Sequence, residues 1–210
     1  MGANCCNHTP DPSTQQQPER YRTILWIALA VNLGMFFIEI ASGVKAGSVS
    51  LLADSLDFLG DAANYGISLW VLGMSIALRA RASLIKAVSM LIFGVGVLTV
   101  AVWHAISGQV PEPQTMGLIG TLALLANLGV AALLYAYREG DSNMRSVWLC
   151  TRNDALGNIA VLLAAVGVFG TGTAWPDLLV ATVMALLAIT SAYQVARQAQ
   201  QELKSEHVHT

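Results

Sequence analysis

Six long apolar segments constrain what this chain can fold into. Each is at least as long as the roughly 20 residues that a helix needs to cross the hydrocarbon core of a membrane. Charged residues make up only 11% of the 210 residues, whereas a soluble domain carries about 25%. We therefore predict an all-α integral membrane protein with six transmembrane helices. The expected helices cover residues 24–44, 51–78, 84–106, 116–137, 147–170 and 176–196.

The basic residues predict how these helices are oriented. Arg20 and Arg22 precede the first segment, and Arg197 and Lys204 follow the last, whereas Lys45 stands alone on the opposite side. By the positive-inside rule the basic side is cytoplasmic. We expect both termini in the cytoplasm and the protein in the inner, or plasma, membrane. The other basic residues of the cytoplasmic side are Arg79, Arg81, Lys86, Arg138 and Arg145.

The ends of the chain differ in composition from the apolar body. Residues 1–20 are polar and proline-rich, which predicts a disordered cytoplasmic tail. We expect a six-helix transmembrane domain over residues 21–200 and a short cytoplasmic tail over residues 201–210. The N-terminal tail is either a plain polar segment or a capture site for soft cations. Its candidate ligands are Cys5, Cys6 and His8.

Three aspartates lie within the second apolar segment. Asp54, Asp57 and Asp61 are spaced i, i+3, i+7, which places them on one face of a helix. A carboxylate in hydrocarbon costs several kcal/mol unless it is paired, hydrated, protonated or bound to a metal. We therefore expect this face to line a polar cavity.

The fifth segment carries a matching stripe. Cys150, Asp154 and Asn158 are spaced i, i+4, i+8. At a rise of about 1.5 Å per residue, Asp61 lies about 15 Å from the outer end of its helix and Asp154 about 14 Å from the cytoplasmic end of its own. Both therefore approach the middle of a membrane about 30 Å thick. Three carboxylates and one thiolate at this depth could form a four-coordinate cation site; the alternative is a set of separate hydrogen-bonded polar residues.

The cysteine narrows the choice of metal. Carboxylates alone would suit Mg²⁺ or Ca²⁺, whereas a thiolate shifts the preference toward Zn²⁺, Cd²⁺ or other thiophilic ions. Cys150 could instead be an inert small apolar residue. Arg152, inside the start of the fifth segment, either extends to the cytoplasmic interface or pairs with a buried carboxylate. Asn32, Glu39 and Asn127 could line the ion pathway or form interhelical hydrogen bonds. Asp54 and Asn158 are further candidates for accessory or pathway residues.

At these two stripes the sequence resembles the cation diffusion facilitator family of metal transporters. The resemblance rests on two motifs, SVSLLADSLDFLGDAANYGISL and CTRNDALGNIAVLLAA, and it extends over residues 22–200. It implies a transport site made of two residues on the second helix and two on the fifth, which fall here on Asp57, Asp61, Cys150 and Asp154. The family usually has His or Asp at the position of Cys150. Most members also carry a cytoplasmic domain after the sixth helix, so we expect a short form, with any homodimer formed through the transmembrane helices.

The expected function is proton-coupled efflux of divalent transition-metal cations, chiefly Zn²⁺ or Cd²⁺, with Co²⁺ or other soft ions as further substrates. No G-x-x-x-x-G-K-[ST] motif is present, so an ion gradient would supply the energy. Mutual repulsion favours protonation of an empty anionic site, and rocking helices would give alternating access. We expect metal ions, protons and lipid as partners, no nucleic acid and no resident cofactor.

Two other classes of function compete with transport. A metal-dependent intramembrane enzyme would need a coordinated water and a general base, and the residues around the stripes include no histidine. A metal-sensing membrane partner protein is suggested by the CCNH motif. We expect a transporter rather than an enzyme.

Overall fold

The computed structural model describes residues 19–70, 76–135 and 142–208. Within these ranges, the side chains of residues 19, 76, 77, 79, 142–153, 202 and 205–208 lie outside the description. The predictions for Cys5, Cys6 and His8 also concern residues outside the described ranges.

The described chain consists of α-helices and contains no strand, which confirms the all-α prediction. Five of the helices are long and apolar enough to cross a membrane. The remaining helix, α2, carries three aspartates, three serines and one asparagine among its apolar residues. The helices are α1 (Glu19–Ala46), α2 (Val49–Trp70), α3 (Ile76–Ser107), α4 (Pro113–Leu134), α5 (Ser142–Thr171) and α6 (Trp175–Val208).

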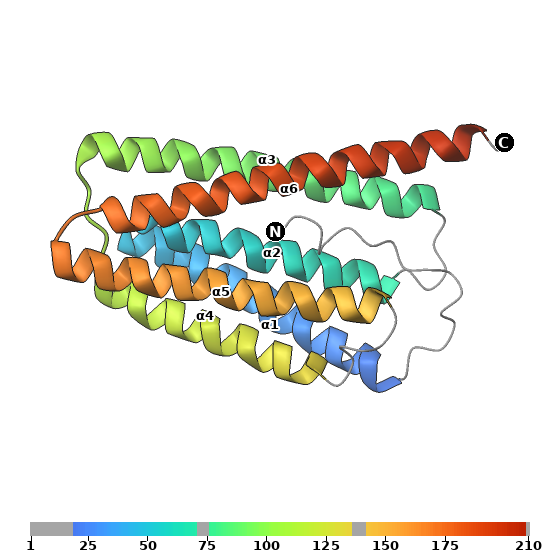
Figure 1. Cartoon of the computed structure of the whole chain (residues 1–210), viewed down its shortest axis with the longest axis horizontal. Helices are drawn as coiled ribbons and strands as arrows, with labels where there is room; N and C mark the ends of the chain where they lie inside the picture. The colour runs from blue at the N-terminus through green and yellow to red at the C-terminus, as the bar shows by residue number, and fades with distance from the viewer. Residues whose placement is uncertain (1–18, 71–75, 136–141, 209–210) are drawn as a thin grey trace.

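α3 and α6 extend furthest beyond their expected apolar segments. α3 begins at Ile76, so Leu78 lies in α3 and not in the second helix, where the unbroken apolar pattern placed it. α6 continues beyond the apolar residues to Val208, because the Gln, Glu, Lys and Ala residues that follow are good helix formers. The 32 residues of α3 and 34 of α6 exceed the roughly 20 needed to cross a bilayer. Both helices extend past the others at the end of the molecule where the C-terminus lies (Figure 1).

The helices form two groups. α3 lies along α6 on one side, and α1, α2, α4 and α5 form the other group (Figure 1). Small residues allow close packing within each group. A Cβ atom at Gly94 would lie 2.9 Å from Cγ1 of Ile189 in α6, and one at Gly43 would lie 3.0 Å from Cδ2 of Leu52 in α2. α2 therefore has its partners on several sides, with α1, α3, α5 and α6 all in contact with it.

An aspartate in the first turn of α6 holds the start of α2 in place. Asp177 in α6 is fully buried, and its carboxylate accepts hydrogen bonds from the hydroxyl of Ser48 (2.7 Å) and the backbone N–H groups of Val49 (2.8 Å) and Ser50 (3.0 Å). The two backbone N–H groups are donors that the first turn of a helix leaves without partners. A carboxylate there also complements the positive end of the helix dipole. α6 thus fixes the position of α2, the helix that carries the aspartate stripe.

Candidate metal site between α2 and α5

One acidic contact joins α2 to α5. Asp61 is 5% exposed, and its carboxyl group interacts directly with that of Asp154. The hydroxyl of Tyr65 donates a hydrogen bond to Oδ2 of Asp61 across 3.1 Å. Two adjacent carboxylates repel each other unless a proton or a cation lies between them. The structure thus brings together two of the four residues expected as ligands.

Asp54 belongs to a polar network that crosses three helices. Asn158 in α5 donates from Nδ2 to Oδ2 of Asp54 across 2.7 Å, and Asn127 in α4 donates from Nδ2 to Oδ1 of Asn158 across 2.8 Å. All three side chains are buried. Asn127 and Asn158 therefore make interhelical hydrogen bonds in the structure. The network fixes the rotamer of Asp54 and keeps α2, α4 and α5 in register.

Asp57 faces α5 at a glycine. A Cβ atom at Gly157 would lie 3.7 Å from Oδ2 of Asp57 and 3.8 Å from Oδ1 of Asp54. The bare backbone of α5 at Gly157 therefore lies directly against both carboxylates. Asp57 shares this part of the α2–α5 interface with Asp54, while Asp61 meets Asp154 one turn further along α2.

Glu39 of α1 completes the acidic interior. It is fully buried, its carboxyl group faces Asp54, and its charge is coupled to that of Asp57. Within the described part of the chain, no donor reaches either carboxyl oxygen of Glu39 in hydrogen-bonding geometry. A buried carboxyl group of this kind is stable only when a proton or cation accompanies it. Asn32, by contrast, donates to the carbonyl oxygen of Ala28 in its own helix across 2.8 Å.

Lys86 is buried, which the sequence interpretation did not predict. We expected it at the cytoplasmic flank, but it is 8% exposed and its ammonium group donates to Oδ1 of Asn64 in α2. Its charge also acts on Asp61. The signal that could have located it is its position two residues inside the third apolar segment, where a lysine needs a partner.

The structure does not describe the side chains of all four expected ligands. Among the side chains that the structure describes, no three of the His, Cys, Asp and Glu type lie close enough together to hold one ion. The helix α5 is continuous through Cys150, which places that residue one turn before Asp154. The side chains of Cys150 and Arg152 lie outside the description, so their roles stay predictions.

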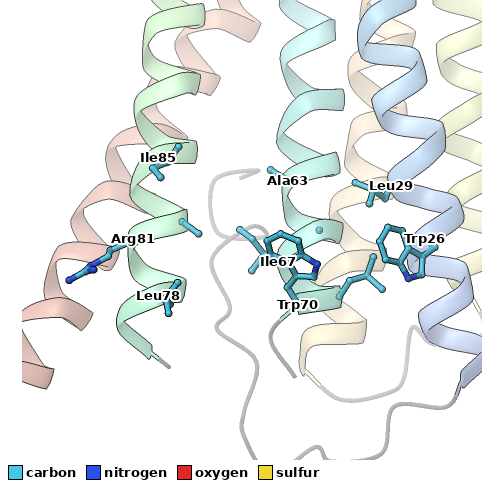
Figure 2. A pocket seen from close by; sticks show the side chains of 11 residues that line it. Trp26, Leu29, Ala63, Ile67, Trp70, Leu78, Arg81 and Ile85 are labelled. Carbon is cyan, nitrogen blue, oxygen red and sulfur yellow. The ribbon is translucent and has the colours of Figure 1, made fainter. Parts of the chain in front are cut away.

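An apolar pocket lies beside this polar interior. It has a volume of about 530 Å³ and opens between α1, α2 and α3. Figure 2 shows Trp26 and Trp70 at the same end of the bundle, and both are largely exposed, as is usual where helices meet the membrane surface. None of the described residues that line it has an acidic, His or Cys side chain, so these residues offer no metal ligand. The labelled lining residues are Trp26, Leu29, Ala63, Ile67, Trp70, Leu78, Arg81 and Ile85.

A family model described as "Cation efflux transmembrane domain" matches residues 25–203. The chain belongs to the cation efflux, or cation diffusion facilitator, family. This membership and the five span candidates make it a multi-pass protein of the plasma membrane. The resemblance drawn from the two motifs is thereby confirmed.

Several curated relatives of this cation efflux protein are transporters by name. "Zinc transporter ZitB" of Escherichia coli is 26% identical over 214 residues, covering 94% of this chain and 67% of the relative. "Cadmium, cobalt and zinc/H(+)-K(+) antiporter" of Bacillus subtilis is 24% identical, covering 84% and 61%. "Metal cation efflux system protein CzcD" of Cupriavidus metallidurans is 26% identical, covering 77% and 55%. The matches thus span about two thirds of the relatives' length or less.

Proposed function

We propose that this protein exports divalent transition-metal ions, Zn²⁺ or Cd²⁺ foremost, from the cytoplasm in exchange for protons. The observation that carries the proposal is the direct contact between the carboxyl groups of the buried Asp61 in α2 and the half-buried Asp154 in α5. A divalent cation is the natural occupant of such a pair, because it neutralises both charges at once. Asp57 and Cys150 are the proposed remaining ligands.

The choice of ions rests on ligand chemistry and on the relatives. A thiolate at Cys150 would favour Zn²⁺ and Cd²⁺ over Mg²⁺ or Ca²⁺. The names of the relatives include zinc, cadmium and cobalt, so Co²⁺ belongs to the substrates to be tested. A transporter is favoured over a metal-dependent enzyme because the relatives are named for transport and efflux.

Proton exchange follows from the charge of the proposed site. Three carboxylates and one thiolate would carry four negative charges against the two positive charges of the metal. Once the metal leaves, repulsion among the same groups in a poorly hydrated interior favours uptake of one or two protons. Protons entering from outside would therefore replace the departing metal.

The arrangement of the helices supports a route for alternating access. The α3–α6 pair packs against the other four helices as a separate group, and rocking of one group against the other would expose the site to each side in turn. In the proposed orientation both termini are cytoplasmic, as the basic residues indicate. The transport domain covers residues 21–200, any homodimer forms through the membrane helices, and the N-terminal CCNH motif supplies ions.

The test is metal uptake into inside-out vesicles or proteoliposomes with a panel of Zn²⁺, Cd²⁺, Co²⁺, Mg²⁺ and Ca²⁺. We expect uptake of the first three ions. A proton gradient directed from the vesicle lumen, which corresponds to the outside of the cell, toward the medium should accelerate this uptake. An ionophore that collapses the pH gradient at a fixed metal gradient should slow the flux. A metal flux that does not change with the proton gradient across pH 6–8 would contradict antiport. Metal-dependent hydrolysis without metal flux would favour an enzyme.

A further inference from the structure

Lys86 is a buried cation that the proposed transport mechanism leaves unused. The membrane-span candidate in α3 begins at Ala80, so Lys86 lies about 9 Å inside it at about 1.5 Å per residue. A lysine that extends to the membrane surface keeps its ammonium group in water. Lys86 instead is 8% exposed and donates its ammonium group to the amide oxygen of Asn64. Its side chain therefore points into the protein, toward α2.

The position of Asn64 brings this charge to the edge of the acidic site. Asn64 lies three residues after Asp61 on α2, a spacing that places neighbouring side chains on one helix face. The ammonium group is close enough to Asp61 to act on it electrostatically. The amide oxygen holds the ammonium group without neutralising it, because an amide carries no net charge.

We propose that the ammonium group of Lys86 is a tethered counter-cation of the Asp61–Asp154 site. It stabilises the two carboxylates when the site is empty, and it repels a metal ion that is bound there. The inference rests on the proposed function. In the empty state the positive charge of Lys86 reduces the repulsion between the two carboxylates. When a divalent ion enters, the positive charge of Lys86 repels the positive charge of the ion, so that metal binding is weakened and metal release is accelerated.

A purely structural role for Lys86 leads to a different expectation. If the contact with Asn64 only joins α3 to α2, its loss should lower stability and leave the affinity for metal unchanged. The two roles are therefore separated by the dissociation constant for the metal, measured on protein that is shown to be folded. Removing one positive charge near the site should strengthen binding of a divalent ion about tenfold.

The experiment uses the full chain in lipid nanodiscs and measures Zn²⁺ and Cd²⁺ binding by competition with a chromogenic chelator. Lys86→Gln removes the charge and keeps a donor for Asn64, whereas Lys86→Arg keeps the charge. We expect about tenfold tighter binding and slower metal release for Lys86→Gln, with wild-type affinity for Lys86→Arg. Asn64→Leu removes the acceptor and frees the ammonium group to approach Asp61, so it should bind metal more weakly.

Asp61→Asn distinguishes failure of this inference from failure of the proposed function. If Asp61→Asn loses binding while Lys86→Gln and Asn64→Leu bind as the wild type does, Lys86 is a structural link and the proposed function stands. If Asp61→Asn binds as tightly as the wild type, the proposed metal site itself is wrong. Should Lys86→Gln fail to fold, the weaker binding expected of Asn64→Leu still decides the question.

Discussion

The hydroxyl group of Tyr65 donates a hydrogen bond to Oδ2 of Asp61 across 3.1 Å, one helical turn further along α2. Both side chains are buried, so water does not compete for this contact. The bond holds one oxygen of the carboxylate in a fixed direction next to Asp154. Tyr65 is therefore a positioning residue for the proposed metal site.

Tyr65→Phe should impair transport without abolishing it. A hydrogen bond to a charged group contributes about 1.5 kcal/mol, so the KM for Zn²⁺ should rise about tenfold while the protein still inserts and folds. Zinc uptake into proteoliposomes measures the change. Tyr193→Phe, at an exposed position of α6, is the matched control, and an equal KM for both variants would contradict the positioning role.

Replacement of either member of the carboxyl pair should abolish transport. Asp61→Asn and Asp154→Asn keep the size of the side chain and remove one negative charge from the proposed ligand set. Metal efflux from cells should fall to background, with normal amounts of protein in the membrane. Glu112→Gln, at an exposed acidic residue, should transport normally. Normal efflux by either aspartate variant would refute the proposed site.

Cys150→His should change the choice between ions. Imidazole is a harder ligand than thiolate, so Zn²⁺ transport should persist and Cd²⁺ transport should weaken. The ratio of the two initial rates, measured in the same preparation of vesicles, reports the change independently of protein amount. An unchanged ratio would identify Cys150 as a packing residue.

Asp177→Asn should destabilise the protein. Its carboxylate accepts bonds from Ser48, Val49 and Ser50, and an amide has only one acceptor oxygen for these donors. The loss should be about 1–3 kcal/mol, measured by thermal unfolding in detergent. Glu112→Gln serves again as the control, and equal stability of the two variants would show that Asp177 does not anchor α2.

Asp54, Asp57 and Asp61 show how far helical periodicity could predict the site. Their common face follows from a spacing within one helix, and the contact between Asp61 and Asp154 was anticipated from depth along two helices. The sequence did not predict that the three aspartates would have different partners on α5. Asn158 of α5 donates a hydrogen bond to Asp54, Asp57 lies against Gly157, and Asp61 contacts Asp154. Which aspartate meets which partner depends on how α5 is rotated and shifted against α2.

The sequence by itself determined the six apolar segments, their helical character and the acidic stripe, because these depend on hydrophobicity and on the period of a single helix. Tertiary structure decided the partners of the buried charges. In the sequence Lys86 is one of several basic residues of the expected cytoplasmic side, and the packing of α3 beside α2 brings its ammonium group to Asn64. Asp177 became the anchor of α2 only through the placement of α6. Such contacts join residues far apart in the chain, and their geometry follows from the packing of whole helices rather than from any local pattern.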